Sequence, residues 1–174
     1  MIIELKKGHN GPPTLSCIRA DGTRTWGKLH PFFPVHDLTH AAVESVLGFN
    51  EAFFGLVASG WNIDEFAAPG AAGRLPMEAR WAESIVGLLD LERGTGIEWS
   101  ASEFNEALKE SLRGQGQTGF RPIDGAELAR TRALRSDLQR RWDELPPGGA
   151  LAVPFPTPDT EESSRSRGAD AHAS

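Results

Sequence analysis

Cysteine is almost absent from this chain. The single cysteine among 174 residues, Cys17, excludes both an internal disulfide and a zinc site built from clustered cysteines. Cys17 falls in a β-rich run, and we expect it to be a small buried hydrophobic side chain rather than a nucleophile.

Long apolar runs are absent as well. No stretch approaches the roughly 18 apolar residues that a helix needs to cross a bilayer. The first residues, MIIELKKGHNGPP, lack an apolar stretch followed by a small-residue cleavage site, so no signal peptide is expected. The sequence therefore predicts a cytoplasmic protein without a membrane span.

Basic residues are also fewer than acidic residues. The chain has 18 lysines and arginines against 24 aspartates and glutamates, which gives a net charge of −6. Nucleic-acid-binding domains usually carry a basic face, so nucleic acid is not an expected partner. Several arginines crowd residues 130–141, but the acidic residues among them indicate a solvated helix face with ion pairs along the helix. The GxSxG and HExxH signatures of hydrolases and zinc peptidases are also missing.

Four polar residues do stand together in the run FFPVHDLTHAAVESVLG: His36, Asp37, His40 and Glu44. On an α-helix, positions 36, 40 and 44 are about 40° apart around the axis, so they share one stripe with Asp37 beside it. Residues four apart lie about 5–6 Å from each other, close enough for two imidazoles to bind one divalent cation. The run predicts a metal site in which Asp37 is either a ligand or a group that orients an imidazole.

A polar network is the alternative to a metal. The same stripe carries Val43 and Leu47, which would face the core, so the polar residues beside them would be buried. Burying such side chains without partners costs several kcal/mol, and either a cation or a hydrogen-bonded network would satisfy them. The sequence does not choose among the residues that could complete the site, which are His30, Glu51, Glu78 and Glu83.

The run also carries a family resemblance. His36-Asp37-x-x-His40 resembles the HDxxH motif of helical ubiquinone-biosynthesis proteins, which bind a divalent metal through that motif and a glutamate about a dozen residues on. Glu51, eleven residues after His40, is one short of this spacing. Because the resemblance covers only this short run, it implies a metal-binding helix and not quinone chemistry. The whole chain also resembles a set of bacterial proteins of unknown function that share HDLTHxxVExxLG, which implies no activity.

The first thirty residues are rich in β-formers. Two such runs within residues 14–29 surround Asp21-Gly22, a strong hairpin signal, because both central positions of the expected turn need a positive φ. Ile2–Leu5 can add a third strand, and alternation over residues 150–155 predicts a strand that returns to the hairpin.

Residues 36–146 follow helical patterns instead. The predicted helix starts are Asn50, Pro76, Ser100 with Glu103, and Asp124 with Glu127. We therefore predict an α+β fold, a mainly helical single domain over residues 1–155 with a small antiparallel N-terminal β-sheet. Residues 156–174 are rich in serine, proline and charge and are predicted to form a disordered tail.

Two functions remain open at this point. The first is a metal-dependent enzyme that acts on a small molecule through a metal-bound water, with zinc, iron or manganese as the ion. The second is a non-catalytic structural or interaction module, in which the cluster is a buried polar network or a structural metal site. Exposure of the stripe to solvent would favour the enzyme, and a seal of aromatic side chains would favour the module. The sequence indicates no oligomeric state.

Overall fold

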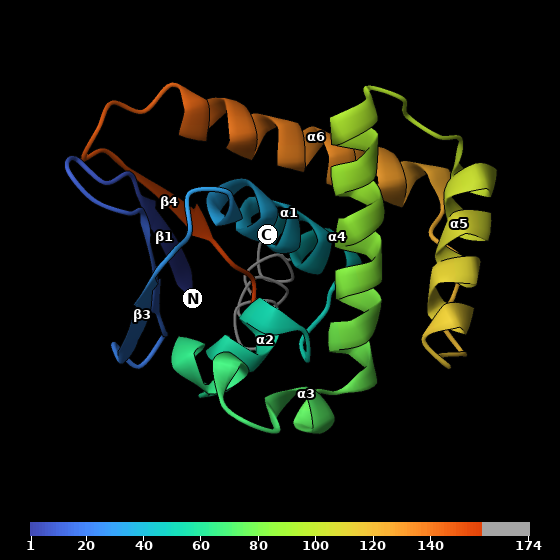
Figure 1. Ribbon diagram of the computed structural model, residues 1–174, viewed down its shortest axis with the longest axis horizontal. Coiled ribbons are helices and arrows are strands. Elements are labelled where there is room, and N and C mark those ends of the chain that lie inside the picture. Colours follow the sequence, from blue (N-terminus) through green and yellow to red (C-terminus); the bar gives the residue numbers. More distant parts are fainter. Residues whose placement is uncertain (158–174) are drawn as a thin grey trace, which may run out of the picture.

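The computed structural model describes residues 1–157 and shows a four-stranded antiparallel sheet at one end of a group of helices (Figure 1). The elements in chain order are β1 (Ile2–Lys6), β2 (Thr14–Ile18), β3 (Arg24–Lys28), α1 (Phe33–Leu47), α2 (Phe53–Ala58), the 3-10 helix η1 (Ile63–Ala67), α3 (Ala71–Arg74), α4 (Met77–Thr95), α5 (Ala101–Gly114), α6 (Gly125–Asp143) and β4 (Ala150–Pro154). The predicted α+β class is confirmed. The predicted disordered tail, 156–174, lies almost wholly outside the described residues.

The sheet has the strand order β3-β2-β1-β4. The predicted return strand β4 exists, but it pairs with β1 and not with the β2–β3 hairpin. β4 lies along the side of β1 that β2 leaves free, and β3 of the hairpin forms the other edge of the sheet. This pairing joins the two ends of the domain, because the Met1 amino group donates to Phe155 O at 3.1 Å.

One face of the sheet forms part of the core. Alternate residues of the strands, including Ile3, Leu15, Cys17 and Leu151, are buried against the helices. Cys17 is fully buried, as expected for a small hydrophobic side chain, and burial raises the pKa of its thiol to about 12. A thiol in this state is not a nucleophile near neutral pH.

The hairpin turn is longer than the sequence suggested. Arg19 N–H donates to Thr23 O at 2.9 Å, and Gly22 N–H donates to Arg19 O at 3.1 Å, so three residues separate the closing pair. Only Gly22 has a positive φ, of 83°. Asp21 keeps an ordinary φ because its carboxylate accepts the Thr23 N–H at 2.9 Å, which stabilises the turn locally.

Gly22→Val should therefore lower the free energy of unfolding by roughly 1 kcal/mol or more, since a β-branched residue resists a positive φ. Urea denaturation measures the loss. Gly11→Val is the matched control, because Gly11 lies in the neighbouring loop without a positive φ and with open space around it. Equal denaturation midpoints for the two variants would contradict this account of the turn.

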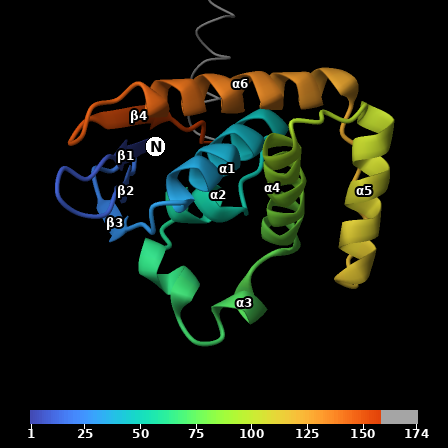
Figure 2. The same ribbon diagram turned by 45° about the horizontal axis from the view of Figure 1, so that its top comes forward.

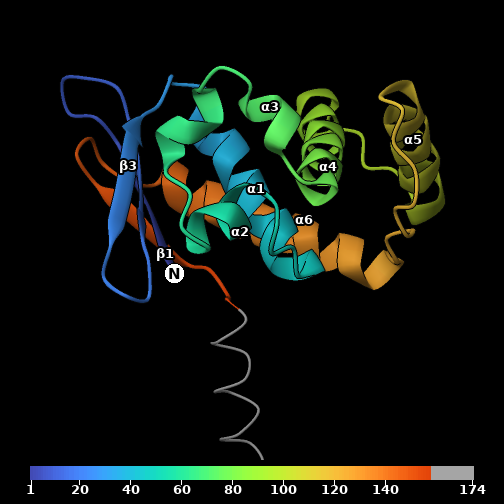
Figure 3. The same ribbon diagram turned by 90° about the horizontal axis from the view of Figure 1, so that it is seen from below.

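Helix α1 lies at the centre of the helical part, where α6 crosses it and α4 packs beside it (Figure 2). It begins with Pro34 in its first turn, where a proline is well tolerated, and ends at Gly48, whose φ of 71° stops the helix. Figure 3 shows the sheet at one end of the domain and α5 at the other, with α1 and α4 between them. Residues on α1 and α4 are therefore well placed to meet.

Two of the arginines on α6 do not lie on a solvated face, contrary to the sequence prediction. Arg132 forms an ion pair with the fully buried Glu92 of α4, and Arg135 donates to the Leu89 carbonyl at 2.6 Å. The other part of the prediction holds, since Arg140 pairs with Asp137 at 2.7 Å along the exposed side. None of the described helices is long and apolar enough to span a membrane.

Candidate metal centre

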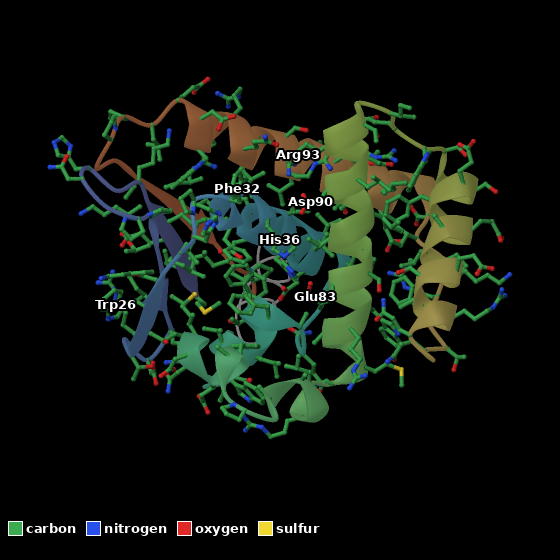
Figure 4. The ribbon with its side chains drawn as sticks, in the orientation of Figure 1. Trp26, Phe32, His36, Glu83, Asp90 and Arg93 are labelled. Atoms are coloured by element: carbon green, nitrogen blue, oxygen red, sulfur yellow. The ribbon has the colours of Figure 1, made fainter. Side chains whose placement is uncertain are left out.

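His36 of α1 faces Glu83 of α4 across the boundary between the two helices (Figure 4). His40 lies one turn further along α1 and belongs to the same group. His40 Nε2 is 3.4 Å from Glu83 Oε1, and His36 Nε2 is 4.0 Å from Glu83 Oε2. One nitrogen or oxygen atom from each of the three residues lies within 4.8 Å of the others. These three side chains could hold a metal ion.

The distances from the two histidine Nε2 atoms to the Glu83 oxygens are close to the distances between ligand atoms around a bound zinc ion. Zinc–nitrogen and zinc–oxygen bonds of about 2.0–2.2 Å in a tetrahedron place neighbouring ligand atoms roughly 3.3 Å apart. The His40–Glu83 distance of 3.4 Å already matches this value, and the 4.0 Å from His36 exceeds it by less than an ångström.

Each imidazole is oriented by a second carboxylate. His36 Nδ1 lies 2.9 Å from Asp90 Oδ2, and His40 Nδ1 lies 3.2 Å from Glu44 Oε1. An ionised carboxylate only accepts hydrogen bonds, so each Nδ1 carries the proton and donates it. Both Nε2 atoms are then turned toward Glu83, which is the orientation that carboxylate partners impose on metal-binding histidines.

Glu44, the glutamate predicted as a metal ligand, has a different set of partners. Its side chain is fully buried, and its Oε2 accepts the N–H of Phe54 at 2.8 Å and of Gly55 at 3.1 Å. These donors belong to the first turn of α2, so Glu44 caps that helix. The Asn50 side chain, predicted as the cap, instead donates to Gly48 O at 3.1 Å.

Asp37 is buried next to the three-residue group but is not part of it. Its Oδ2 has no hydrogen-bond partner among residues 1–157. Burial raises the pKa of its carboxyl to about 6, against the opposing charges of His40 and His36. A buried carboxylate oxygen without a partner is costly, which makes Asp37 a residue that a ligand could satisfy.

The charges around His40 favour its protonated form when no ion is present. Burial alone would lower the pKa of His40, but hydrogen bonds to Glu44 and Glu83 and the charges of both carboxylates raise it to about 10. The same contact with His40 lowers the pKa of Glu83. Burial raises the pKa of Glu44, while its hydrogen bonds favour the ionised form. A cation at this point would replace the proton on His40 Nε2.

The group is sealed on one side and open on the other. The His40 side chain is 4% exposed and has the Phe53 ring 6.2 Å away, centroid to centroid. The His36 side chain is 31% exposed and that of Glu83 is 60% exposed. Solvent therefore reaches the space between His36 and Glu83, which favours a site that can exchange ligands over a closed structural one.

The remaining candidates lie elsewhere. The Glu78 carboxylate accepts the Glu51 backbone N–H, and the His30 ring stacks on Phe32 with centroids 5.3 Å apart. None of these belongs to the three-residue group. The residue that sequence reasoning missed altogether is Asp90. Its signal was its position seven residues after Glu83, which places both carboxylates on one face of α4.

Comparison with known proteins adds no relative. No protein-family model matches the chain, and no curated protein or solved structure gives a significant match. The resemblance of the HDLTH run to known families therefore stays a prediction.

Proposed function

We propose that this protein binds one divalent cation through His36 Nε2, His40 Nε2 and the Glu83 carboxylate. The observation that carries the proposal is the pairing of both Nδ1 atoms with carboxylates, His36 with Asp90 and His40 with Glu44. A polar network alone needs only one partner per imidazole. In this protein each imidazole has one carboxylate at its Nδ1, and both Nε2 atoms face Glu83. Metal-binding histidines commonly show this arrangement.

The donor set limits the kind of ion. Two imidazoles with one carboxylate suit zinc, iron and manganese, whereas magnesium and calcium prefer sites made only of oxygen atoms. Sites with two histidines and one carboxylate serve both zinc hydrolases and non-haem iron enzymes. We therefore propose zinc, iron or manganese as the bound ion.

We further propose that the protein is an enzyme that acts on a small molecule at this site. Three protein ligands leave a position for water, and a divalent cation lowers the pKa of such a water enough to make it a nucleophile near neutral pH. The exposed side of Glu83 and His36 gives a substrate access. The unpartnered Oδ2 of Asp37 offers a further hydrogen-bond acceptor beside the site.

A non-catalytic module is the second candidate, and one observation favours it. His40 lies between Glu44 and Glu83, and a protonated ring there satisfies both carboxylates without any ion. In that case the cluster would only join α1 to α4 and α2. Metal binding distinguishes the proposed site from a polar network without an ion.

Metal titration of His40→Ala tests the proposal. Wild-type protein, purified without a histidine tag and treated with a chelator, should bind one equivalent of Zn²⁺ or Mn²⁺, and its melting temperature should rise by mass action. His40→Ala should lose at least about 100-fold in affinity and show no metal-dependent shift. His30→Ala is the matched control, because His30 lies shortly before α1 in the chain but does not belong to the three-residue group.

Two outcomes would count against the proposal. Stoichiometric metal retained by His36→Ala/His40→Ala would mean that the ion binds elsewhere. A wild type that is fully stable and binds neither ion would make the non-catalytic module the better account.

A further inference from the structure

A glycine stands in the middle of α4 at the level of the metal site. Gly87 lies four residues after Glu83 and three before Asp90, far from either end of the helix. Glycine is the poorest helix former after proline, so its presence in a central turn works against the helix. No packing contact requires it, because a Cβ added to Gly87 would meet nothing within 4 Å.

Gly87 lies between the two α4 residues that pair with His36. The His36 ring reaches both Glu83, at 4.0 Å, and Asp90, at 2.9 Å, and therefore spans the part of α4 that contains Gly87. Figure 4 shows Asp90, His36 and Glu83 following one another along the boundary of α1 and α4. Val86 is fully buried while Gly87 is exposed, so the gap lies on the solvent side of the site.

Apolar surface faces solvent at the same place. Phe33, in the first turn of α1, is 51% exposed, and its ring centroid lies 6.3 Å from that of His36. Phe32 before it is 82% exposed. Sites that bind small molecules are lined mainly by apolar and aromatic side chains around a few polar groups.

We propose that Gly87 is a specificity-determining residue of the site: ligands of the cation enter across Gly87, with an apolar group packed on Phe33. The substrate class is then a small molecule that presents oxygen atoms to the cation and carries a compact apolar group next to them. This inference rests on the metal site proposed above. It adds the direction from which a ligand approaches the cation and a limit on the size of that ligand.

Hydroxamates test the inference, because they bind metal ions through two oxygen atoms. Protein loaded with Co²⁺ is titrated with acetohydroxamate and benzohydroxamate, and the visible absorption of the ion reports binding. Wild type should bind benzohydroxamate several-fold more tightly, and Phe33→Ala should remove this preference. Gly87→Leu should weaken both hydroxamates by about tenfold or more while its Co²⁺ affinity stays that of wild type.

Gly94→Leu is the matched control. Gly94 lies on the same helix, is exposed, and has the same open space around it, but it is seven residues further from the site. Leucine is a better helix former than glycine, so both variants should fold. Gly87→Gln is a second bulky variant, and it should have the same effect as Gly87→Leu.

The outcomes separate this inference from the metal site itself. Wild-type hydroxamate affinities in Gly87→Leu and Gly87→Gln, with Co²⁺ bound, would overturn the inference and leave the metal site standing. An equal loss in Gly94→Leu would overturn it as well, because the effect would not be local. Failure of the wild type to bind Co²⁺ would overturn the proposed function first.

Discussion

Glu44→Ala should be the most destabilising single substitution in the site, with a loss of about 3–5 kcal/mol in the free energy of unfolding. The Glu44 carboxylate is fully buried and accepts the N–H groups of Phe54 and Gly55 as well as His40 Nδ1. Alanine would leave these donors buried without an acceptor and would remove the cap of α2. Urea denaturation in the presence of a chelator measures the loss without any contribution from metal.

Two further variants make this result specific. Glu44→Gln should lose less, because its amide oxygen can still accept the N–H groups of α2. Glu51→Ala should change the free energy of unfolding by less than about 0.5 kcal/mol, because Glu51 is exposed. A stability of Glu44→Ala close to that of Glu51→Ala would show that the carboxylate does not support the fold.

Glu83→Gln should affect metal affinity more than it affects stability. Its metal affinity should fall by about 100-fold or more, which corresponds to roughly 2.7 kcal/mol of binding free energy, because a neutral amide replaces the only carboxylate ligand. Its stability without metal should fall less than that of Glu44→Ala, since the Glu83 side chain is 60% exposed and a glutamine oxygen can still accept from protonated His40. Isothermal titration with Zn²⁺ and urea denaturation with chelator measure the two effects separately.

Glu78→Gln serves as the control for Glu83→Gln, because Glu78 lies on the same helix but outside the three-residue group. It should bind metal as the wild type does. Unchanged metal affinity in Glu83→Gln would remove this residue from the site, and a large loss of stability without metal would show that its main role is to support the fold.

The sequence predicts His36 and His40 as ligands but names Glu83 only as one of four residues that could complete the site. His36 and His40 follow one another at a spacing that any α-helix places on one face, so their proximity is a local property. Glu83 comes to them only because α4 packs against α1, and this packing depends on long-range contacts that no spacing in the sequence reveals. The spacing of Asp90 from Glu83 places both on one face of α4 but does not show that this face packs against α1.

Glu44 illustrates the opposite case, a residue on the predicted stripe with a different role. The sequence correctly placed it near His40, and the two side chains do contact each other at 3.2 Å. What it could not show is that the chain turns back after Gly48 and brings the first turn of α2 against Glu44. The carboxylate then has backbone donors to satisfy.

The fold shows the same division between local and long-range information. Capping residues predicted two helix starts correctly, because Ser100 with Glu103 and Asp124 with Glu127 act on their own neighbours. The strand β4 was also predicted, but its partner was not, since both β1 and β3 offer a free edge and the strand's own residues do not choose between them. The burial of Arg135 against α4 is equally a matter of packing.

Anomalous scattering from crystals grown with one equivalent of Zn²⁺ locates the bound ion. We expect one strong peak between α1 and α4, within about 2.0–2.2 Å of His36 Nε2, His40 Nε2 and a Glu83 oxygen, with Glu44 still capping α2. A fully loaded protein whose zinc peak lies elsewhere, or is bound by Glu44 in place of Glu83, would contradict the proposed metal site.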